Sequence, residues 1–450
     1  MTDRLNGAER IECRLVIIDS DSMRVLTTAA GAGSSLPRES VPAYTRVAGA
    51  FNEAIEQRYG LRTIQLAVLP GTTELISCAV HEIMGLQEQQ LRSLSFAALD
   101  EVGSNDLTET ERSLILKIMM GEANPLGRFA RIGWIYELVA KAGGNRDRKS
   151  MPVTRQLNQG IDFCLLSLTD ASGRKVWFKA VGEPNIHEYA LTGELTRRFP
   201  SYLPKTVTTT PEWNGWVMED ANGLPLNESG AIYQCEEAFT ALAIMQKEMA
   251  TDIASLSAIG AKSWTWSRIA PLLDPFFTEA WRAMRAQTSD KSKPLSGGEL
   301  NQLQRDIKSA LDEFMNAGIP ETLLHGDIGH GNVIATCEGT IFLDWAEAYI
   351  GHPFLTAEYL LADLARSNPM FAEKQAALRS HYASHWKGYV QPSELERIIG
   401  LAPAIAAFVY GVITWDANFY RSEPTQAWPL MRSMLRRTKR ELERAAEFIA

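Results

Sequence analysis

The sequence predicts an α+β fold with two lobes, a small antiparallel β lobe and a larger, mainly helical lobe, preceded by a small α/β domain. Short apolar runs separated by turn residues recur between residues 151 and 222, and helical periodicity dominates the chain after residue 354. A length of 450 residues favours two or three compact units. The expected parts are an accessory domain, a small lobe with linker helices, and a large lobe: residues 1–105, 106–222 and 223–450.

Composition indicates an ordinary globular protein, because hydrophobic residues make up 45% and charged residues 22% of the chain. A net charge of −9 argues against a nucleic-acid-binding protein. The five cysteines are scattered without a C-x-x-C pair, which argues against disulfides or a zinc site. The apolar residues 398–412 contain Pro403 and are too short for a membrane span, and the polar N-terminus lacks a leader. We therefore expect a cytoplasmic enzyme that binds no membrane.

Residues 9 to about 100 predict the small α/β domain, with a helix at 43–59 that ends at Gly60. The expected strands are residues 13–18, 24–28, 64–69 and 74–80. This order resembles a Nudix-type fold. A working Nudix helix carries a glutamate-rich pattern that binds magnesium, and aligning its glycine with Gly60 leaves that carboxylate cluster largely missing. The missing carboxylates favour a catalytically inactive accessory domain, and the chain could form a homodimer through this domain.

In the small lobe, Lys179 shares a strand face with Trp177 and Val181 by period-two alternation. A lysine on an apolar face should be paired or bound to a ligand, because burying a lone ammonium group is costly. A surface lysine with a buried stem is the alternative. The strand belongs to an expected three-strand meander: residues 151–157, 161–168 and 175–181.

Two glutamates of the following helix could pair with Lys179. Glu188 stands three residues after Asn185, so it could be a capping partner or the ion-pair partner of the lysine. Glu194 lies about 240° around the helix from Glu188, at roughly 100° per residue, so only one of them can face the strand. We expect Glu188 to do so.

One later stretch carries the chemistry. Residues 324–334 and 341–345 follow a strand–turn–strand pattern and contain Asp327, Asn332 and Asp344. In phosphoryl transfer, a carboxylate accepts the proton of the attacking hydroxyl, while an amide oxygen and a second carboxylate hold the magnesium ions that bridge the phosphates of ATP. The Asp-x-x-x-x-Asn spacing equals that of a kinase catalytic loop. The stretch predicts a small-molecule kinase with Asp327 as base and Asn332 and Asp344 as metal ligands.

The upstream elements stand in the order that this chemistry requires. Lys179 would contact the α- and β-phosphates of ATP, held in place by Glu188. Asn158 and Gly160 lie where kinases fold a glycine-rich loop over ATP, although an ordinary hairpin turn is an equal alternative. Backbone groups of the segment between the lobes would bind adenine: Met218, Glu219 and Asp220.

Together these motifs are similar to those of the aminoglycoside phosphotransferases and related small-molecule kinases, such as choline kinase-like and homoserine kinase-like proteins. The resemblance covers about residues 128–450. It implies a protein kinase-like fold and transfer of phosphate from ATP, with magnesium, to a small-molecule hydroxyl. The segments that carry it are Leu324-His325-Gly326-Asp327, Asn332, Leu343-Asp344-Trp345 and Gly351-His352-Pro353.

The chain departs from this family at two places. Gly329-His330 replaces a frequent His-Pro, and Thr356 stands where an aspartate is common, which puts one supporting hydrogen bond in doubt. With Asp327 as the base, His325 is expected to be a structural residue.

The acceptor stays open among an antibiotic, a sugar and an amino alcohol. Four residues near the loops of the C-terminal helical block are candidate contacts: Asp416, Tyr420, Glu423 and Trp428. Two other functions are weighed against the kinase: a nucleotide-binding pseudokinase or regulatory protein, and Nudix-type hydrolysis by the N-terminal domain.

Overall fold

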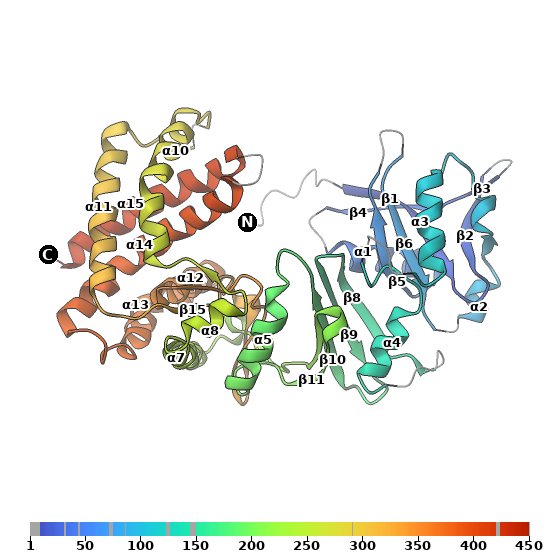
Figure 1. The fold of residues 1–450 in the computed structure, drawn as a ribbon, viewed down its shortest axis with the longest axis horizontal. Coiled ribbons are helices and arrows are strands. Elements are labelled where there is room, and N and C mark those ends of the chain that lie inside the picture. The colour runs from blue at the N-terminus through green and yellow to red at the C-terminus, as the bar shows by residue number, and fades with distance from the viewer. Residues whose placement is uncertain are drawn as a thin grey trace. The chain divides into compact units, whose positions relative to one another are not determined.

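The computed structural model describes residues 10–30, 33–43, 46–71, 75–85, 87–122, 127–144, 150–289, 291–419 and 424–449 (Figure 1). The chain forms two compact units. Unit 1 comprises Met1–Tyr189 and Lys205–Asp220, and unit 2 comprises Ala190–Pro204 and Ala221–Ala450. The expected accessory domain and small lobe thus share one unit, while the three-part division itself stays a prediction.

Unit 1 begins with a seven-stranded sheet in the order β3-β2-β1-β6-β5, with β4 on β1 and β7 on β2. β1 and β6 run parallel, and the other pairs are antiparallel. The strands are β1 (Arg10–Asp19), β2 (Arg24–Ala30), β3 (Gly33–Ser35), β4 (Arg38–Pro42), β5 (Thr63–Leu69), β6 (Cys78–Ile83) and β7 (Ser95–Ala97). β1 is buried without interruption from Cys13 to Ile18 because both of its faces are covered.

A buried ion pair ties the helix that contains Glu111 to this sheet. Arg14 of β1 is fully buried, and its guanidinium lies 2.5 Å from Glu111. It also donates to the carbonyl oxygens of Ile76 and Asp106. Burial alone would raise the pKa of Glu111, but hydrogen bonds from Arg14 and Thr108 lower it below its ordinary value. The helices are α1 (Val47–Tyr59), α2 (Glu88–Leu91), α3 (Glu109–Met119) and α4 (Trp134–Lys141).

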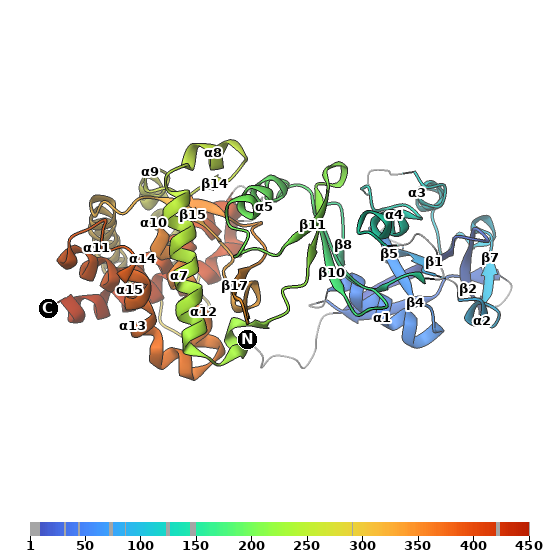
Figure 2. The same ribbon diagram turned by 90° about the horizontal axis from the view of Figure 1, so that it is seen from below.

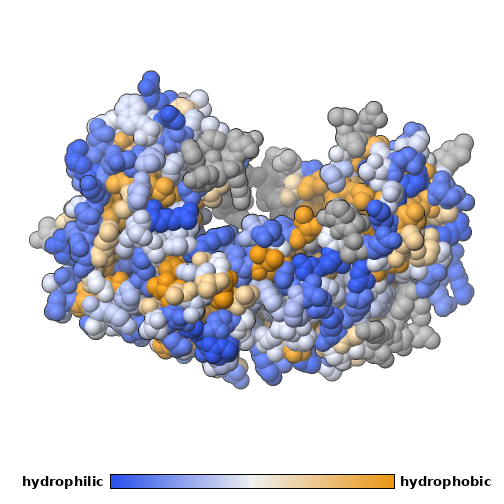
Figure 3. Space-filling view, in the orientation of Figure 1, coloured by the Kyte–Doolittle hydropathy of each residue, from blue (hydrophilic) through white to orange (hydrophobic). Residues whose placement is uncertain are grey.

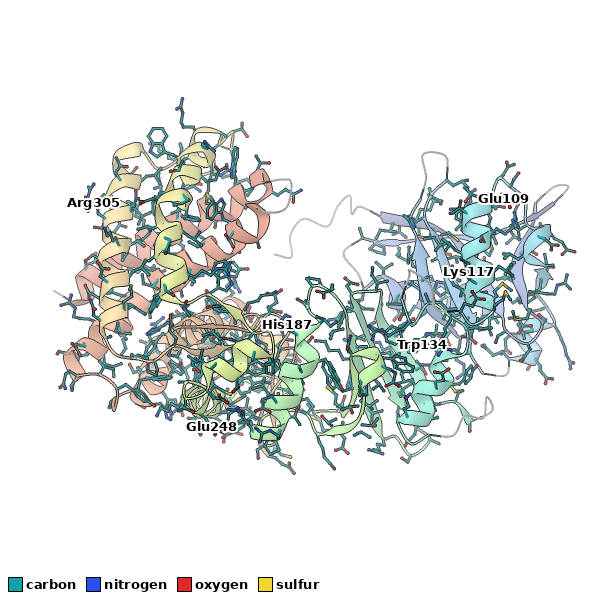
Figure 4. The ribbon with its side chains drawn as sticks, viewed as in Figure 1. Glu109, Lys117, Trp134, His187, Glu248 and Arg305 are labelled. Atoms are coloured by element: carbon teal, nitrogen blue, oxygen red, sulfur yellow. The ribbon has the colours of Figure 1, made fainter. Side chains whose placement is uncertain are left out.

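The second sheet of unit 1 contains the predicted meander. Its strands are β8 (Val153–Gln159), β9 (Phe163–Thr169), β10 (Lys175–Val181), β11 (Thr206–Thr210) and β12 (Gly215–Glu219), antiparallel throughout in the order β11-β12-β10-β9-β8. Trp134, labelled in Figure 4, packs with Phe129, Phe178 and Trp213 at ring centroid distances of 4.9, 6.4 and 6.3 Å. This aromatic cluster fixes α4 to the sheet.

Gln156 joins the two sheets of unit 1, because its amide acts like a strand partner of β5. The side chain is only 2% exposed. Its Oε1 accepts from the backbone N–H of Gln65 at 2.8 Å and from Asn52 at 3.0 Å, and its Nε2 donates to the carbonyl of Gln65 at 2.9 Å. Gln159 adds a hydrogen bond to the carbonyl of Leu66 at 3.2 Å. Two edge strands, β5 and β8, are thus connected through side-chain amides.

We predict that Gln156→Met destabilises the protein by about 2–6 kcal/mol, which is about 1–3 kcal/mol for each of two orphaned backbone groups. Methionine is similar in size but leaves the buried N–H and C=O of Gln65 without a partner. Urea unfolding followed by fluorescence measures the change. Gln57→Met, at an exposed position of α1, is the control, and equal midpoints for the two variants would contradict the role of the amide.

Unit 2 is mainly helical and has one large apolar core. α5 (His187–Arg198) crosses from unit 1 into unit 2. The other helices are α6 (Leu226–Ser229), α7 (Ile232–Met249), α8 (Ile253–Ala258), α9 (Trp266–Ile269), α10 (Leu273–Arg285), α11 (Gly297–Asn316), α12 (Pro353–Ser367), α13 (Pro369–Ser384), α14 (Pro392–Phe419) and α15 (Trp428–Ile449). α14 lies along α15, and α7 lies beside α13 (Figure 2).

Two small sheets of unit 2 frame the candidate catalytic segment. One has the order β13-β16-β17 and the other β14-β18-β15. The strands are β13 (Leu224–Pro225), β14 (Lys262–Ser263), β15 (Thr322–Leu324), β16 (Val333–Thr336), β17 (Gly339–Phe342) and β18 (Tyr349–Gly351). Sheets and helices together confirm the predicted α+β class. The visible surface is largely hydrophilic with scattered hydrophobic areas, as is usual for globular proteins (Figure 3).

Helix α14 corrects one prediction. It continues through Pro403, and its residues Pro392–Ala417 are long and apolar enough to cross a membrane by length and composition, so the expectation that the chain has no such segment is wrong. However, 67% of its apolar window is buried inside the protein. Contacts with α12 and α15 account for this burial, as in the core helix of a globular protein.

Candidate functional site

The candidate catalytic segment is held by hydrogen bonds between its own residues. Asn332 Nδ2 donates to the carbonyl of Asp327 at 2.9 Å and to Asp327 Oδ2 at 3.2 Å. Between them, the N–H of Gly329 donates to the carbonyl of Asp327, and the N–H of Asn332 donates to that of Gly329, both at 3.0 Å. The turn after β15 therefore places the carboxylate and the amide, predicted from their spacing, in direct contact.

Asp344 is connected to the same turn through the residue before it. The N–H of Leu343 donates to the carbonyl of Asn332 at 2.9 Å. The buried ring of His325 lies with Nε2 at 2.7 Å from the carbonyl of Leu343, so Nε2 carries the proton in this hydrogen bond. His325 is thus placed as a structural tether. Asp344 itself has φ = 62°, a left-handed conformation that aspartate tolerates better than most residues.

These three side chains fit the oxygen chemistry of magnesium. The amide nitrogen of Asn332 is engaged by Asp327, which leaves Oδ1 for a cation. Asp327 and Asp344 are exposed carboxylates. Among the described residues, no three His, Cys, Asp or Glu side chains gather as a metal site. A magnesium ion here would need phosphate and water oxygens to complete its shell, which is its usual mode of binding.

Glu347 is a third carboxylate at this place, which the sequence reasoning missed. Its backbone packs on Gly326: a Cβ added to that glycine would lie 2.0 Å from the carbonyl oxygen of Glu347. Partial burial raises the pKa of Glu347, and the charges of Asp327 and Asp344 raise it further, while Lys262 opposes them. Its position three residues after Asp344 was the only signal in the sequence.

Tyr410 of α14 lies within electrostatic range of the same carboxylates. Its pKa is raised first by burial and then by the charges of Glu347 and Asp327. Its ring lies 5.7 Å from that of Tyr359 on α12, and 42% of the residue is exposed. The helical block therefore brings an aromatic hydroxyl to the candidate catalytic segment.

In unit 1, Lys179 and Glu188 form the expected pair. Lys179 Nζ lies 2.5 Å from Glu188 Oε1, with side-chain exposures of 6% and 1%. The ammonium also lies over the rings of Phe163 and Trp216 at 5.3 and 5.9 Å. Glu194 binds Arg197 and Arg198 instead, so the helix-face argument chose the correct partner. His187, labelled in Figure 4, marks the start of the helix.

Gly160 of the predicted phosphate loop lies in the turn between β8 and β9. A Cβ added there would lie 2.6 Å from Asp162 Oδ1. That exposed carboxylate would repel a phosphate group. Asn158 lies in β8, where it pairs with Leu165 of β9 beside a bulge. The ordinary hairpin thus accounts for both residues, and their nucleotide role stays a prediction.

The segment expected to bind adenine, Met218 to Asp220, lies at the C-terminal end of β12. The N–H groups of Glu219 and Asp220 donate to the carbonyls of Lys205 and Lys175 at 2.9 and 3.3 Å. The adenine of a nucleotide could use these two N–H donors only if that strand pairing changed. Met218 lies at the centre of the pairing, opposite residues of β10 and β11.

The candidate acceptor contacts in the C-terminal block have internal partners where the structure describes them. Asp416 pairs with Arg268 at 3.2 Å, and Trp428 Nε1 donates to Glu279 at 2.7 Å. Tyr420 and Glu423 lie outside the described residues.

His352 of the Gly-His-Pro motif is a core residue. It is 1% exposed and lies among the rings of Phe314, Phe354 and Trp266 at 4.8, 5.7 and 5.5 Å. Neither ring nitrogen has a hydrogen-bond partner among the described residues, and burial lowers its pKa to about 3. The hydroxyl of Thr356 is likewise buried without a partner there, at the position where the sequence puts a supporting hydrogen bond in doubt.

We predict that Lys179→Met lowers the free energy of unfolding by about 3–5 kcal/mol, because it leaves Glu188 buried and unpaired. The double variant with Glu188→Leu should recover most of this loss. Denaturant unfolding of the nucleotide-free protein measures both. Lys175→Met, on the same strand but 40% exposed, should cost at most about 1 kcal/mol; a similar cost for both lysines would contradict the argument.

His352→Phe should protect the protein against acid. The folded-state pKa of about 3 lies below the ordinary histidine pKa of 6.5, so the unfolded chain binds the extra proton between these values. Stability is therefore lost as the pH falls from 6.5, at up to about 1.4 kcal/mol per pH unit. Melting temperatures at pH 7 and pH 5 should show a larger advantage of the variant at pH 5, and a constant difference would refute the buried neutral histidine.

Among known protein families, the Phosphotransferase enzyme family matches this chain over residues 212–394. This segment contains Asp327, Asn332 and Asp344. No curated protein matches the sequence. The match confirms the predicted family and the predicted enzyme class, a phosphotransferase.

Similar solved structures include three small-molecule kinases. The macrolide 2'-phosphotransferase of Brachybacterium faecium is 14% identical, with a TM-score of 0.43, over 67% of this chain and 98% of that chain. Choline kinase of Cryptosporidium parvum is 13% identical, with a TM-score of 0.43, over 69% and 96%. Ethanolamine kinase of Plasmodium vivax is 14% identical, with a TM-score of 0.40, over 62% and 78%. The family match carries the conclusion: this chain contains a domain of the phosphotransferase enzyme family.

Proposed function

We propose that this protein transfers the γ-phosphoryl group of ATP to a hydroxyl group of a small molecule in the cytoplasm. The observation that supports it best is the contact between Asp327 and Asn332 inside the matched domain, with Asp344 connected to the same turn. A carboxylate, an amide oxygen and a second carboxylate are the groups that such a transfer requires.

Asp327 is the proposed general base. Its carboxylate accepts the proton of the acceptor hydroxyl as that oxygen forms a bond to the γ-phosphorus and the bond to the β-phosphate oxygen breaks, releasing ADP. The hydrogen bond from Asn332 holds Oδ2, so the other carboxylate oxygen is the one for the substrate. Asn332 and Asp344 would hold magnesium, which when bound neutralises the phosphate charge.

Lys179 is the proposed ligand of the ATP phosphates, oriented by Glu188. The short buried pair keeps the ammonium in one place. The two-lobe family pattern assigns adenine to Met218, Glu219 and Asp220 and the phosphate loop to Asn158 and Gly160; these are the positions that the observed strand pairing supports least.

The presence of Glu347 narrows the choice among the three classes of phosphate acceptor. A carboxylate beside the proposed base would attract a cationic group, and the exposed ring of Tyr410 could contact it. Among an antibiotic, a sugar and an amino alcohol, this favours acceptors that carry an amine over neutral sugars. Choline kinase and ethanolamine kinase appear among the similar structures.

The decisive experiment is an ATP-consumption screen over amino alcohols, aminoglycosides, macrolides and neutral sugars with magnesium. We expect turnover with an amine-bearing alcohol. Asp327→Asn should lower it by about 10²–10⁴-fold at unchanged melting temperature, because the base is lost while the side-chain shape is kept. Asp312→Asn, an exposed aspartate on α11, is the control. Binding of magnesium-ATP without turnover on any acceptor would favour a pseudokinase instead.

A further inference from the structure

Unit 1 contains a cavity of about 240 Å³ between α1, the segment that follows it and β8. Its lining includes two carboxylates of α1, Glu53 and Glu56, and two arginines, Arg62 and Arg155. Gln156, the amide that joins the two sheets, also lines it. The cavity therefore adjoins the hydrogen bonds through which Gln156 connects the small lobe to the N-terminal domain.

The four charged side chains share one cavity without pairing with each other. All are exposed, and within the described part of the chain none forms an ion pair or a side-chain hydrogen bond. Another exposed arginine of the same domain does form an ion pair: Arg58 lies 3.2 Å from the partly buried Glu39. Separated charges of both signs around one space are suited to a ligand that carries both signs.

The cavity is also built on fixed elements. The backbone of Arg62 is held by Gln87, whose Oε1 accepts from its N–H at 2.9 Å and whose Nε2 donates to its carbonyl at 3.0 Å. α1 approaches β8 so closely at Gly49 that an added Cβ would lie 2.9 Å from the carbonyl of Gln156. A site on such elements loses little entropy on binding.

The lining selects the class of ligand. Arginine is suited to bind a carboxylate and glutamate to bind an ammonium group, and the two charges of each sign cancel overall. Met84, Met151 and Val153 add an apolar side. We propose that this cavity binds an α-amino acid with an apolar side chain, its carboxylate on Arg62 and Arg155 and its ammonium on Glu53 and Glu56.

Isothermal titration of the full chain with L-leucine and L-methionine tests the proposal. At least one of them should bind. The matched probes are leucine amide, which lacks the carboxylate, and 4-methylpentanoate, which lacks the ammonium group. Each should bind at least tenfold more weakly than L-leucine, because one half of the charge match is lost.

Substitutions of lining residues test whether the amino acid binds in this cavity. Arg155→Gln and Glu53→Gln should each weaken binding at least tenfold, whereas Arg92→Gln, an 82% exposed side chain outside the cavity, should leave it unchanged. Binding should persist in Asp327→Asn, which separates this site from the proposed acceptor site. Absence of binding at millimolar amino acid, or binding that neither cavity variant alters, would overturn the proposal while leaving the proposed kinase activity untouched.

Discussion

The hydrogen bond from the N–H of Leu343 to the carbonyl of Asn332 is the constraint on which the candidate site depends. It joins the turn after β15 to the segment that follows β17 and contains Asp344. The side chain of Asn332 in turn donates a hydrogen bond to Asp327. The buried His325 holds Leu343 in place through a hydrogen bond to its carbonyl oxygen. One backbone contact thus connects the segments that carry the two carboxylates, which follow β15 and β17, and the buried histidine explains why the motif begins with His rather than with a smaller residue.

Much of this site could be predicted because it is local. Asp327 and Asn332 lie on one turn, and their spacing alone puts them in contact. Lys179 and Glu188 are also close in sequence, and two short-range rules, alternation along a strand and 100° per helical residue, selected the partner that lies at 2.5 Å. The same locality explains the confirmed meander of β8, β9 and β10, in which each strand pairs with the next.

Other features depend on contacts between distant segments and left no local signal. Glu347 joins the site because its backbone packs on Gly326. Arg14 would be an unlikely core residue in an apolar strand until Glu111 is seen beside it. α14 continues through Pro403 where it packs on α12 and α15, because buried apolar surface can outweigh one lost helical hydrogen bond.

The N-terminal domain is best understood through its contact with the small lobe. An open edge strand exposes unpaired backbone groups, and proteins cover such edges. β5 and β8 are both edge strands, and Gln156 satisfies the backbone of Gln65 where the two meet. A truncated protein that starts at the expected boundary near residue 105 would lack β5. It would also lack Arg14, the ion-pair partner of Glu111. The small lobe would lose both an edge cover and a buried ion pair, so this domain is a structural part of the lobe whatever else it binds.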